Sequence, residues 1–143
     1  MHVKEIDTAA ARQFVIVLDP GEEALACLQD FARQYRLPGA EFTGLGALHD
    51  ATLGFFDFDA KDYVRIHIDE QVEVVTLVGN LAMTGDKPSV HPHAVVAKRD
   101  GSAWGGHLLE AHVRPTLEII VAEVPAHLCR RPDPKTGLAL LSV

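Results

Sequence analysis

The sequence of 143 residues is poor in cysteine and has no long apolar run. Its two cysteines, Cys27 and Cys129, form no C-x-x-C pair, which argues against a thiolate metal site or a redox motif. Sparse cysteine favours a reducing compartment. No stretch of about 18 apolar residues is present, and the first residues lack the apolar segment of a signal peptide. We therefore expect a cytoplasmic protein without a membrane-spanning segment.

Positive charge is also scarce, because 13 lysines and arginines face 20 acidic residues and give a formal net charge of -7. Such a chain repels a phosphate backbone unless its cations gather on one face. The cations are scattered along the sequence, without the interleaved aromatic residues that are typical of single-strand binders. An AT-hook needs an Arg-Gly-Arg core, and the sequence 130–132, Arg-Arg-Pro, lacks that glycine. We interpret it as a solvated turn, so direct DNA binding has little support from charge.

The composition predicts one globular domain over residues 1–143, because 48% of the residues are hydrophobic. Residues 14–18 predict a buried strand. A helix follows, with Asp19 as its N-cap and Pro20 at its first position, and apolar residues recur at helical spacing up to Tyr35. The sequence 37–39, Leu-Pro-Gly, ends it.

Strand-like patterns fill the rest of the chain, and no second long helix is indicated. The predicted strands cover residues 41–48, 51–58, 63–68, 73–81, 91–98, 107–113 and 117–124, and an apolar segment at 138–141 follows a polar turn. Strands joined by short turns favour an antiparallel or mixed sheet. The predicted class is α+β, with one main helix packed on the sheet.

Three histidines carry the chemical signal of the chain. His91 and His93 flank Pro92, and His107 follows the glycine pair 105–106. Residues i and i+2 of a strand point to the same face, so His91 and His93 can hold one ion between them. His107 can supply a third ligand if the chain turns back near Asp100 and Gly101. Imidazole suits zinc and several transition metals, so spacing alone does not choose the metal.

The register of this hairpin decides whether His107 reaches the same face. A strict two-residue loop at residues 100–101 would set His93 opposite Leu108 and turn His107 to the other side of the sheet. A three-residue loop, or a bulge at the glycine pair, turns His107 back to the face that carries His91 and His93. We therefore predict a longer loop or a bulge. The alternative is that each histidine is an ordinary surface or hydrogen-bonded residue.

The sequence as a whole resembles the plants and prokaryotes conserved (PPC) domain family. The resemblance rests on the segments 20–22 (PGE), 44–48 (GLGAL), 73–80 (EVVTLVGN), 91–93 (HPH) and 105–108 (GGHL), in this order. It implies an α+β domain, assembly as a homotrimer, and a zinc site at His91, His93 and His107. In plants this domain follows AT-hook motifs, and for that reason prokaryotic relatives carry names that propose DNA binding.

Three classes of function follow from these observations. The first is a trimeric binding or assembly module with a divalent metal, zinc, in the three-His site. The second is a metal-dependent enzyme of unknown reaction, in which metal-bound water is acidified and a carboxylate acts as base. Glu73, Glu110 and Glu118 are candidates by residue type, but Glu73 and Glu118 lie within apolar strand runs and can equally be charges paired with arginine or backbone amides at an interface. The third is a DNA-associated regulator. The sequence favours the first class.

Overall fold

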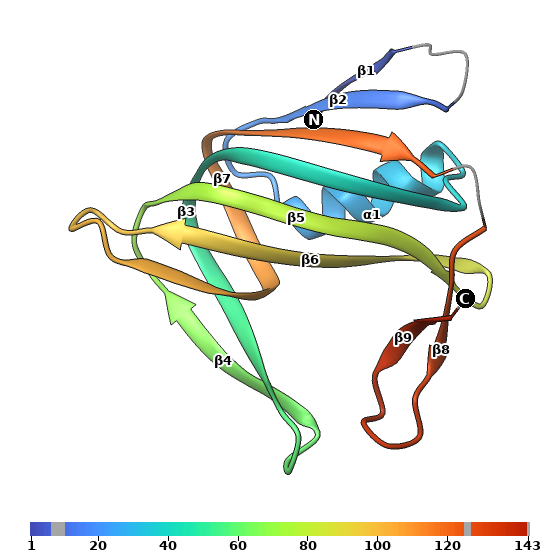
Figure 1. Ribbon diagram of the computed structural model, residues 1–143. Coiled ribbons are helices and arrows are strands. Elements are labelled where there is room, and N and C mark those ends of the chain that lie inside the picture. Colours follow the sequence, from blue (N-terminus) through green and yellow to red (C-terminus); the bar gives the residue numbers. More distant parts are fainter. Residues whose placement is uncertain (7–10, 125–126, 143) are drawn as a thin grey trace.

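The computed structural model describes residues 1–6, 11–124 and 127–142. Within these ranges the chain forms one helix and nine strands (Figure 1). The elements are β1 (His2–Ile6), β2 (Gln13–Leu18), α1 (Ala24–Gln34), β3 (Gly39–Asp57), β4 (Asp62–Ile68), β5 (Val72–Thr84), β6 (Lys87–Ala97), β7 (Ala103–Glu123), β8 (Cys129–Pro132) and β9 (Ala139–Ser142). The α+β class predicted from the sequence is confirmed.

The strands belong to one mixed sheet with the order β1-β2-β7-β3-β5-β8-β9. Every pair is antiparallel except β5 with β8. Strand β6 pairs with both β5 and β7, and β4 pairs with the far end of β3. Since β3 also pairs with β5 and β7, the strands β3, β5, β6 and β7 close a circuit. The hairpin of β3 and β4 projects from this body as an arm (Figure 1).

Two long strands, β3 and β7, replace four of the predicted strands. The prediction of separate strands at 41–48 and 51–58, and at 107–113 and 117–124, was wrong. The pairing of β3 with β7 shifts register between Gly46 and Leu48 and again before Asp50. Such bulges bend a strand and break its two-residue period without ending its pairing. The alternation of apolar and polar residues is therefore interrupted within β3 and β7, although each strand continues through the bulges.

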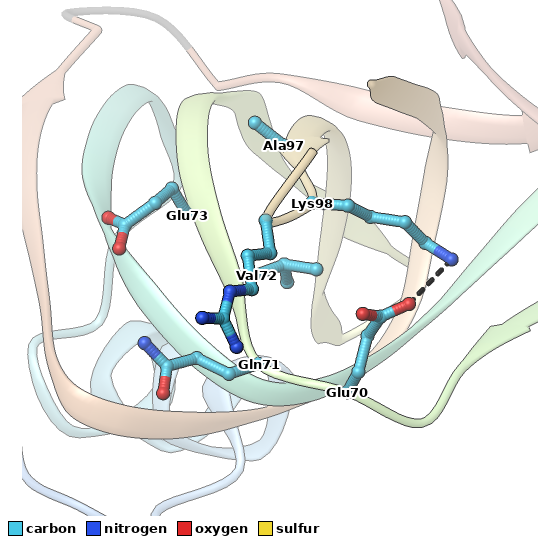
Figure 2. A pocket seen from close by; sticks show the side chains of 7 residues that line it. Glu70, Gln71, Val72, Glu73, Ala97 and Lys98 are labelled. Atoms are coloured by element: carbon cyan, nitrogen blue, oxygen red, sulfur yellow. Dashed lines mark ion pairs between the residues drawn. The ribbon is translucent and has the colours of Figure 1, made fainter. Parts of the chain in front are cut away.

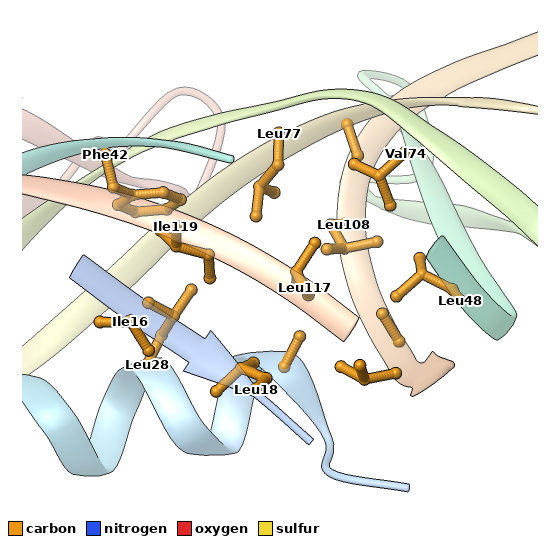
Figure 3. Packing of buried hydrophobic residues seen from close by; sticks show 14 of the residues in the cluster. Ile16, Leu18, Leu28, Phe42, Leu48, Val74, Leu77, Leu108, Leu117 and Ile119 are labelled. Atoms are coloured by element: carbon orange, nitrogen blue, oxygen red, sulfur yellow. The ribbon is translucent and has the colours of Figure 1, made fainter. Parts of the chain in front are cut away.

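The hydrophobic core lies between α1 and one face of the sheet. Leu28 of the helix packs with Ile16 and Leu18 of β2, and Leu117 and Ile119 of β7 lie above them (Figure 3). All five side chains are buried. The opposite face of these strands carries no helix in the described part of the chain.

The start of the helix differs from the prediction. Asp19 is not the N-cap, because residues 19–22 form a turn in which Gly21 has a φ of 85°. The N-cap is Glu23, whose carboxylate accepts hydrogen bonds from the backbone N–H groups of Leu25 (3.1 Å) and Ala26 (2.7 Å). Glycine supports this positive φ, so the turn delays the helix by four residues.

The C-terminal segment also departs from the prediction. Residues 130–132 were expected to form a solvated turn, but β8 pairs with β9 and Arg130 is buried. The predicted apolar segment 138–141 corresponds to β9. No described helix is both long enough and apolar enough to cross a membrane.

Candidate metal centre

The hairpin of β6 and β7 sets the positions of His93 and His107. These two residues are direct register partners, and Ala97 pairs with Ala103. Residues 99–101 form a three-residue loop, closed by a hydrogen bond from the Lys98 N–H to the Ser102 carbonyl oxygen (2.9 Å). The predicted longer loop is confirmed. The alternative, a bulge at the glycine pair, is not used in this pairing, which shows no register shift.

His91 lies on the same face, two residues before His93, opposite Asn80 of β5. The neighbouring Gly79 lets the strands approach closely. A Cβ atom at Gly79 would overlap the ring of Phe42 and would lie 2.5 Å from the carbonyl oxygen of His91. Gly79 therefore allows the close approach of β5 to the backbone of His91.

The three imidazole rings form a nearly equilateral triangle. Their centroids are 5.2 Å apart for His91 and His93, 5.1 Å for His91 and His107, and 5.2 Å for His93 and His107. One ligand nitrogen of each ring lies within 4.8 Å of the other two. The centre of such a triangle is about 3 Å from each centroid, close to the distance that a zinc–nitrogen bond of about 2.0–2.1 Å requires. Two nitrogens bonded to one zinc ion are at most about 4.2 Å apart, so small side-chain rotations would bring all three rings onto a single ion.

Burial favours the neutral form of two of the three imidazoles, those of His91 and His107. Burial, followed by the charges of His91, His93 and Arg130, lowers the pKa of His107 to about 4. Burial, followed by Arg130 and His93, also lowers the pKa of His91. A metal ion binds only unprotonated imidazole. Both residues are already unprotonated at neutral pH, so metal binding does not have to displace a proton from either of them. The buried Nδ1 of His107 has no hydrogen-bond partner among the described residues, and coordination to a metal ion would use its lone pair instead.

A small cavity of about 140 Å³ opens beside the cluster. His91, His107 and Arg130 line it together with residues of β4, β6 and β9. Tyr63 of the arm stacks on the His107 ring with centroids 4.9 Å apart. The cluster therefore faces a cavity on one side, as an ion with an open coordination position requires. Sequence reasoning missed Arg130, and its neighbours in the chain gave no signal for burial.

A larger pocket, of about 500 Å³, lies at the other end of β5 and β6 (Figure 2). Figure 2 shows Glu70, Glu73 and Lys98 around it. Lys98 is paired with Glu70 at 2.7 Å and lies over the Trp104 ring, with its Nζ 4.8 Å from the centroid. Its cation is thus already satisfied within the chain, and the three histidines are not part of this pocket.

The other histidines and the candidate carboxylates lie elsewhere. His112 lies outside the cluster, and its Nδ1 donates to the Asp50 carboxylate at 2.7 Å. Asp50 also contacts Nδ1 of His49 at 2.9 Å. His67 bonds Thr52 instead. The candidate bases Glu73, Glu110 and Glu118 are exposed, and none of them lines the cavity beside the three histidines.

Fold and site together define a small single-helix α+β domain with a three-His cluster. The sequence matches the profile of the Plants and Prokaryotes Conserved (PCC) domain, also abbreviated PPC, over residues 6–125. The chain belongs to this family, and the resemblance noted in the sequence is confirmed.

Solved structures with the same fold include three with clear sequence similarity. A metal-containing protein from Archaeoglobus fulgidus is 31% identical, with a TM-score of 0.85 over 92% of this chain and 93% of that one. A protein from Ralstonia eutropha JMP134, whose name proposes DNA binding, is 33% identical, with a TM-score of 0.88 over 98% and 96%. A PPC protein from Pyrococcus horikoshii is 28% identical, with a TM-score of 0.87 over 96% and 98%.

Curated relatives are much longer than this chain. The bifunctional protein GlmU of Synechococcus sp. strain JA-3-3Ab is 34% identical over 141 residues, which are 96% of this chain and 21% of that protein. GlmU of strain JA-2-3B'a(2-13) is 35% identical over 129 residues, which are 88% and 19%. The chain thus spans about a fifth of the curated relatives it matches.

Proposed function

We propose that this protein is a homotrimeric assembly module that binds one divalent metal ion, zinc, through His91, His93 and His107. The observation that carries the proposal is the triangle of imidazole rings, whose centroids are 5.1–5.2 Å apart. The low pKa of His107 and its unpartnered Nδ1 support the same conclusion. The similar protein from Archaeoglobus fulgidus is described as metal-containing.

Two separate apolar patches support the homotrimer. The outer patch consists of Leu45, Val75, Val78 and Ile120, which are 60, 59, 44 and 57% exposed. Thr43 pairs with both Val78 and Ile120, so the patch spans three strands on the face opposite the helix.

The second patch lies on the arm formed by β3 and β4. This arm patch consists of Phe55 and its register partner Val64, which are 67 and 52% exposed. Exposed apolar patches mark interaction surfaces. A ring of identical subunits joins two different surfaces of each chain, whereas a twofold dimer needs only one. Two distinct patches on one chain therefore favour a ring such as a trimer.

The outer patch and the three-His cluster are continuous across the sheet. Ile120 pairs with Thr43, Thr43 with Val78, Val78 with His93, and His93 with His107. Register partners on adjacent strands share a face. Subunit contact and metal binding thus use one face of one sheet, which is why we assign the metal to an assembly module. The occurrence of a similar segment within the longer GlmU proteins is consistent with a module.

A metal-dependent enzyme is the alternative with the same site. A hydrolytic mechanism needs a base within hydrogen-bond reach of the metal-bound water. No carboxylate of the described residues lines the cavity, and the three glutamates considered from sequence are exposed elsewhere. The module is therefore the better-supported function.

DNA association is a second candidate, favoured by the name of the Ralstonia protein. The net charge of -7 works against it. A mobility-shift assay with duplex DNA tests it: binding that weakens steeply as salt rises supports association, and no shift at low salt contradicts it.

A zinc titration against a chromophoric chelator tests the main proposal. The unmodified protein should bind one zinc per chain, and His107→Ala should weaken binding by about 100-fold or more. His67→Ala is the matched control, because His67 is an exposed histidine bonded to Thr52. Less than one zinc per chain, or equal affinity in His107→Ala, would contradict the proposal.

A further inference from the structure

Arg130 is a buried cation whose hydrogen-bond partners are all neutral. Only 7% of it is exposed. Its Nη1 donates to the carbonyl oxygen of Ala139 at 3.4 Å, and its Nη2 donates to Oδ1 of Asn80. Its buried Nε has no partner among the described residues. Buried charges are normally paired, because desolvating a lone ion is costly.

Among the described residues, no acidic side chain is paired with Arg130. Burial alone is what lowers the pKa of Arg130, without an opposing effect from an acidic group. The guanidinium nevertheless stays protonated, given its very high reference pKa. A divalent ion on His91 and His107 would add a second positive charge to the same cavity. An anion between the two cations would offset both.

The cavity limits the size of that anion. Its volume of about 140 Å³ corresponds to about four or five water molecules at about 30 Å³ each. Pockets for drug-sized ligands are several times larger. The cavity therefore suits a ligand of a few non-hydrogen atoms.

The lining of the cavity indicates the chemistry of the anion. Val90, Leu138 and Leu140 form apolar walls, and Ser89 and Tyr63 add hydroxyl groups. Arg130 is the one side-chain cation among the lining residues. One guanidinium matches one carboxylate, and apolar walls suit a short alkyl chain rather than a polyanion.

We propose that this cavity binds a small monocarboxylate of about four to six non-hydrogen atoms, with its carboxylate paired to Arg130 beside the three histidines. The inference rests on the metal site proposed above, because the metal ion is the second cation that the carboxylate would neutralise. It assigns Arg130 to ligand binding rather than to stability alone.

Calorimetric titration of zinc-loaded protein with acetate and propionate tests the proposal, and zinc binding is measured separately on the same samples. Both carboxylates should bind, and acetamide, the uncharged analogue of acetate, should bind at least tenfold more weakly. Inorganic phosphate should bind more weakly than acetate. Equal binding of acetamide, or tighter binding of phosphate, would overturn the assignment.

Substitutions locate the binding. Arg130→Gln should weaken acetate binding at least tenfold while changing zinc affinity less than threefold. The matched control is Arg131→Gln, because Arg131 is the next residue on β8 and is exposed. It should leave both affinities unchanged. Acetate affinity within twofold of the unmodified protein in Arg130→Gln would overturn the proposal.

A second variant, Ala139→Leu, tests the location of the site if Arg130→Gln fails to fold. Ala139→Leu narrows the cavity and keeps the backbone carbonyl that accepts from Arg130. It should weaken propionate binding more than acetate binding, and unchanged binding of both contradicts the proposed location. Zinc binding without acetate binding overturns this inference alone. Failure of the unmodified protein to bind zinc overturns the proposed metal site itself.

Discussion

Single residues set the spacing of the strands that carry the site. Gly79 shows this most clearly, because its Cα sits against the Phe42 ring and the carbonyl oxygen of His91. A side chain at this position would push β6 away from β5. The position of His91 thus depends on glycine at position 79, because any other residue would place a Cβ atom there.

We expect Gly79→Ala to destabilise the protein by about 1–3 kcal/mol, the range for overpacked interiors. Gly105→Ala is the control, since its Cβ would lie 3.3 Å from the Val95 side chain and 3.5 Å from the nearest backbone atom, both longer than the contacts at Gly79. Its effect should be much smaller. Urea unfolding measures both. Equal midpoints for Gly79→Ala and the unmodified protein would contradict the close approach.

Asp50 controls the protonation of His112. The hydrogen bond that the His112 imidazole donates to the Asp50 carboxylate raises the pKa of His112, although burial opposes it. A raised pKa contributes stability that is fully present below the unfolded value of about 6.5 and is lost as pH rises through the folded value. Asp50→Asn should lower the pKa of His112. A proton NMR titration of the imidazole measures it, and an unchanged pKa would contradict the contact.

At the scale of elements, Glu23 joins the helix to the sheet. Its carboxylate caps α1 and also accepts a hydrogen bond from the Ala111 N–H at 3.2 Å. Glu23→Ala should therefore lower the free energy of unfolding by about 1–2 kcal/mol. Asp19→Ala is the comparison, because the sequence pattern predicted Asp19 as the cap. Asp19→Ala should lower the free energy of unfolding by less, because Asp19 is half-exposed and its ion pair is with the amino group of Met1. Chemical denaturation of both variants decides between the two caps.

The elements show what sequence patterns can predict in this protein. The helix, the strands around the histidines and the three-residue loop follow from local spacing, because each depends on residues close in the chain. The continuity of β3 and β7 does not, since bulges near Gly46 break the two-residue pattern. Arg130 was missed for a different reason. Its burial depends on the docking of β8 and β9 against Asn80, which is 50 residues away.

At the scale of the whole molecule, the two apolar patches predict a cyclic oligomer. Light scattering should give a mass of about 47 kDa, three times the chain mass of 15.6 kDa. Ile120→Asp places a charge in the outer patch and should shift the mass toward a monomer. Leu141→Asp is the control, because Leu141 is an exposed leucine on β9, outside both patches. A monomeric unmodified protein would contradict the trimer.

The most direct test of the account is anomalous diffraction at the zinc absorption edge, from crystals of protein purified without added metal or chelator. The account predicts one peak per chain, about 2.0–2.1 Å from one nitrogen each of His91, His93 and His107. Absence of a peak there, or a peak only at the other histidine cluster around Asp50, would contradict it.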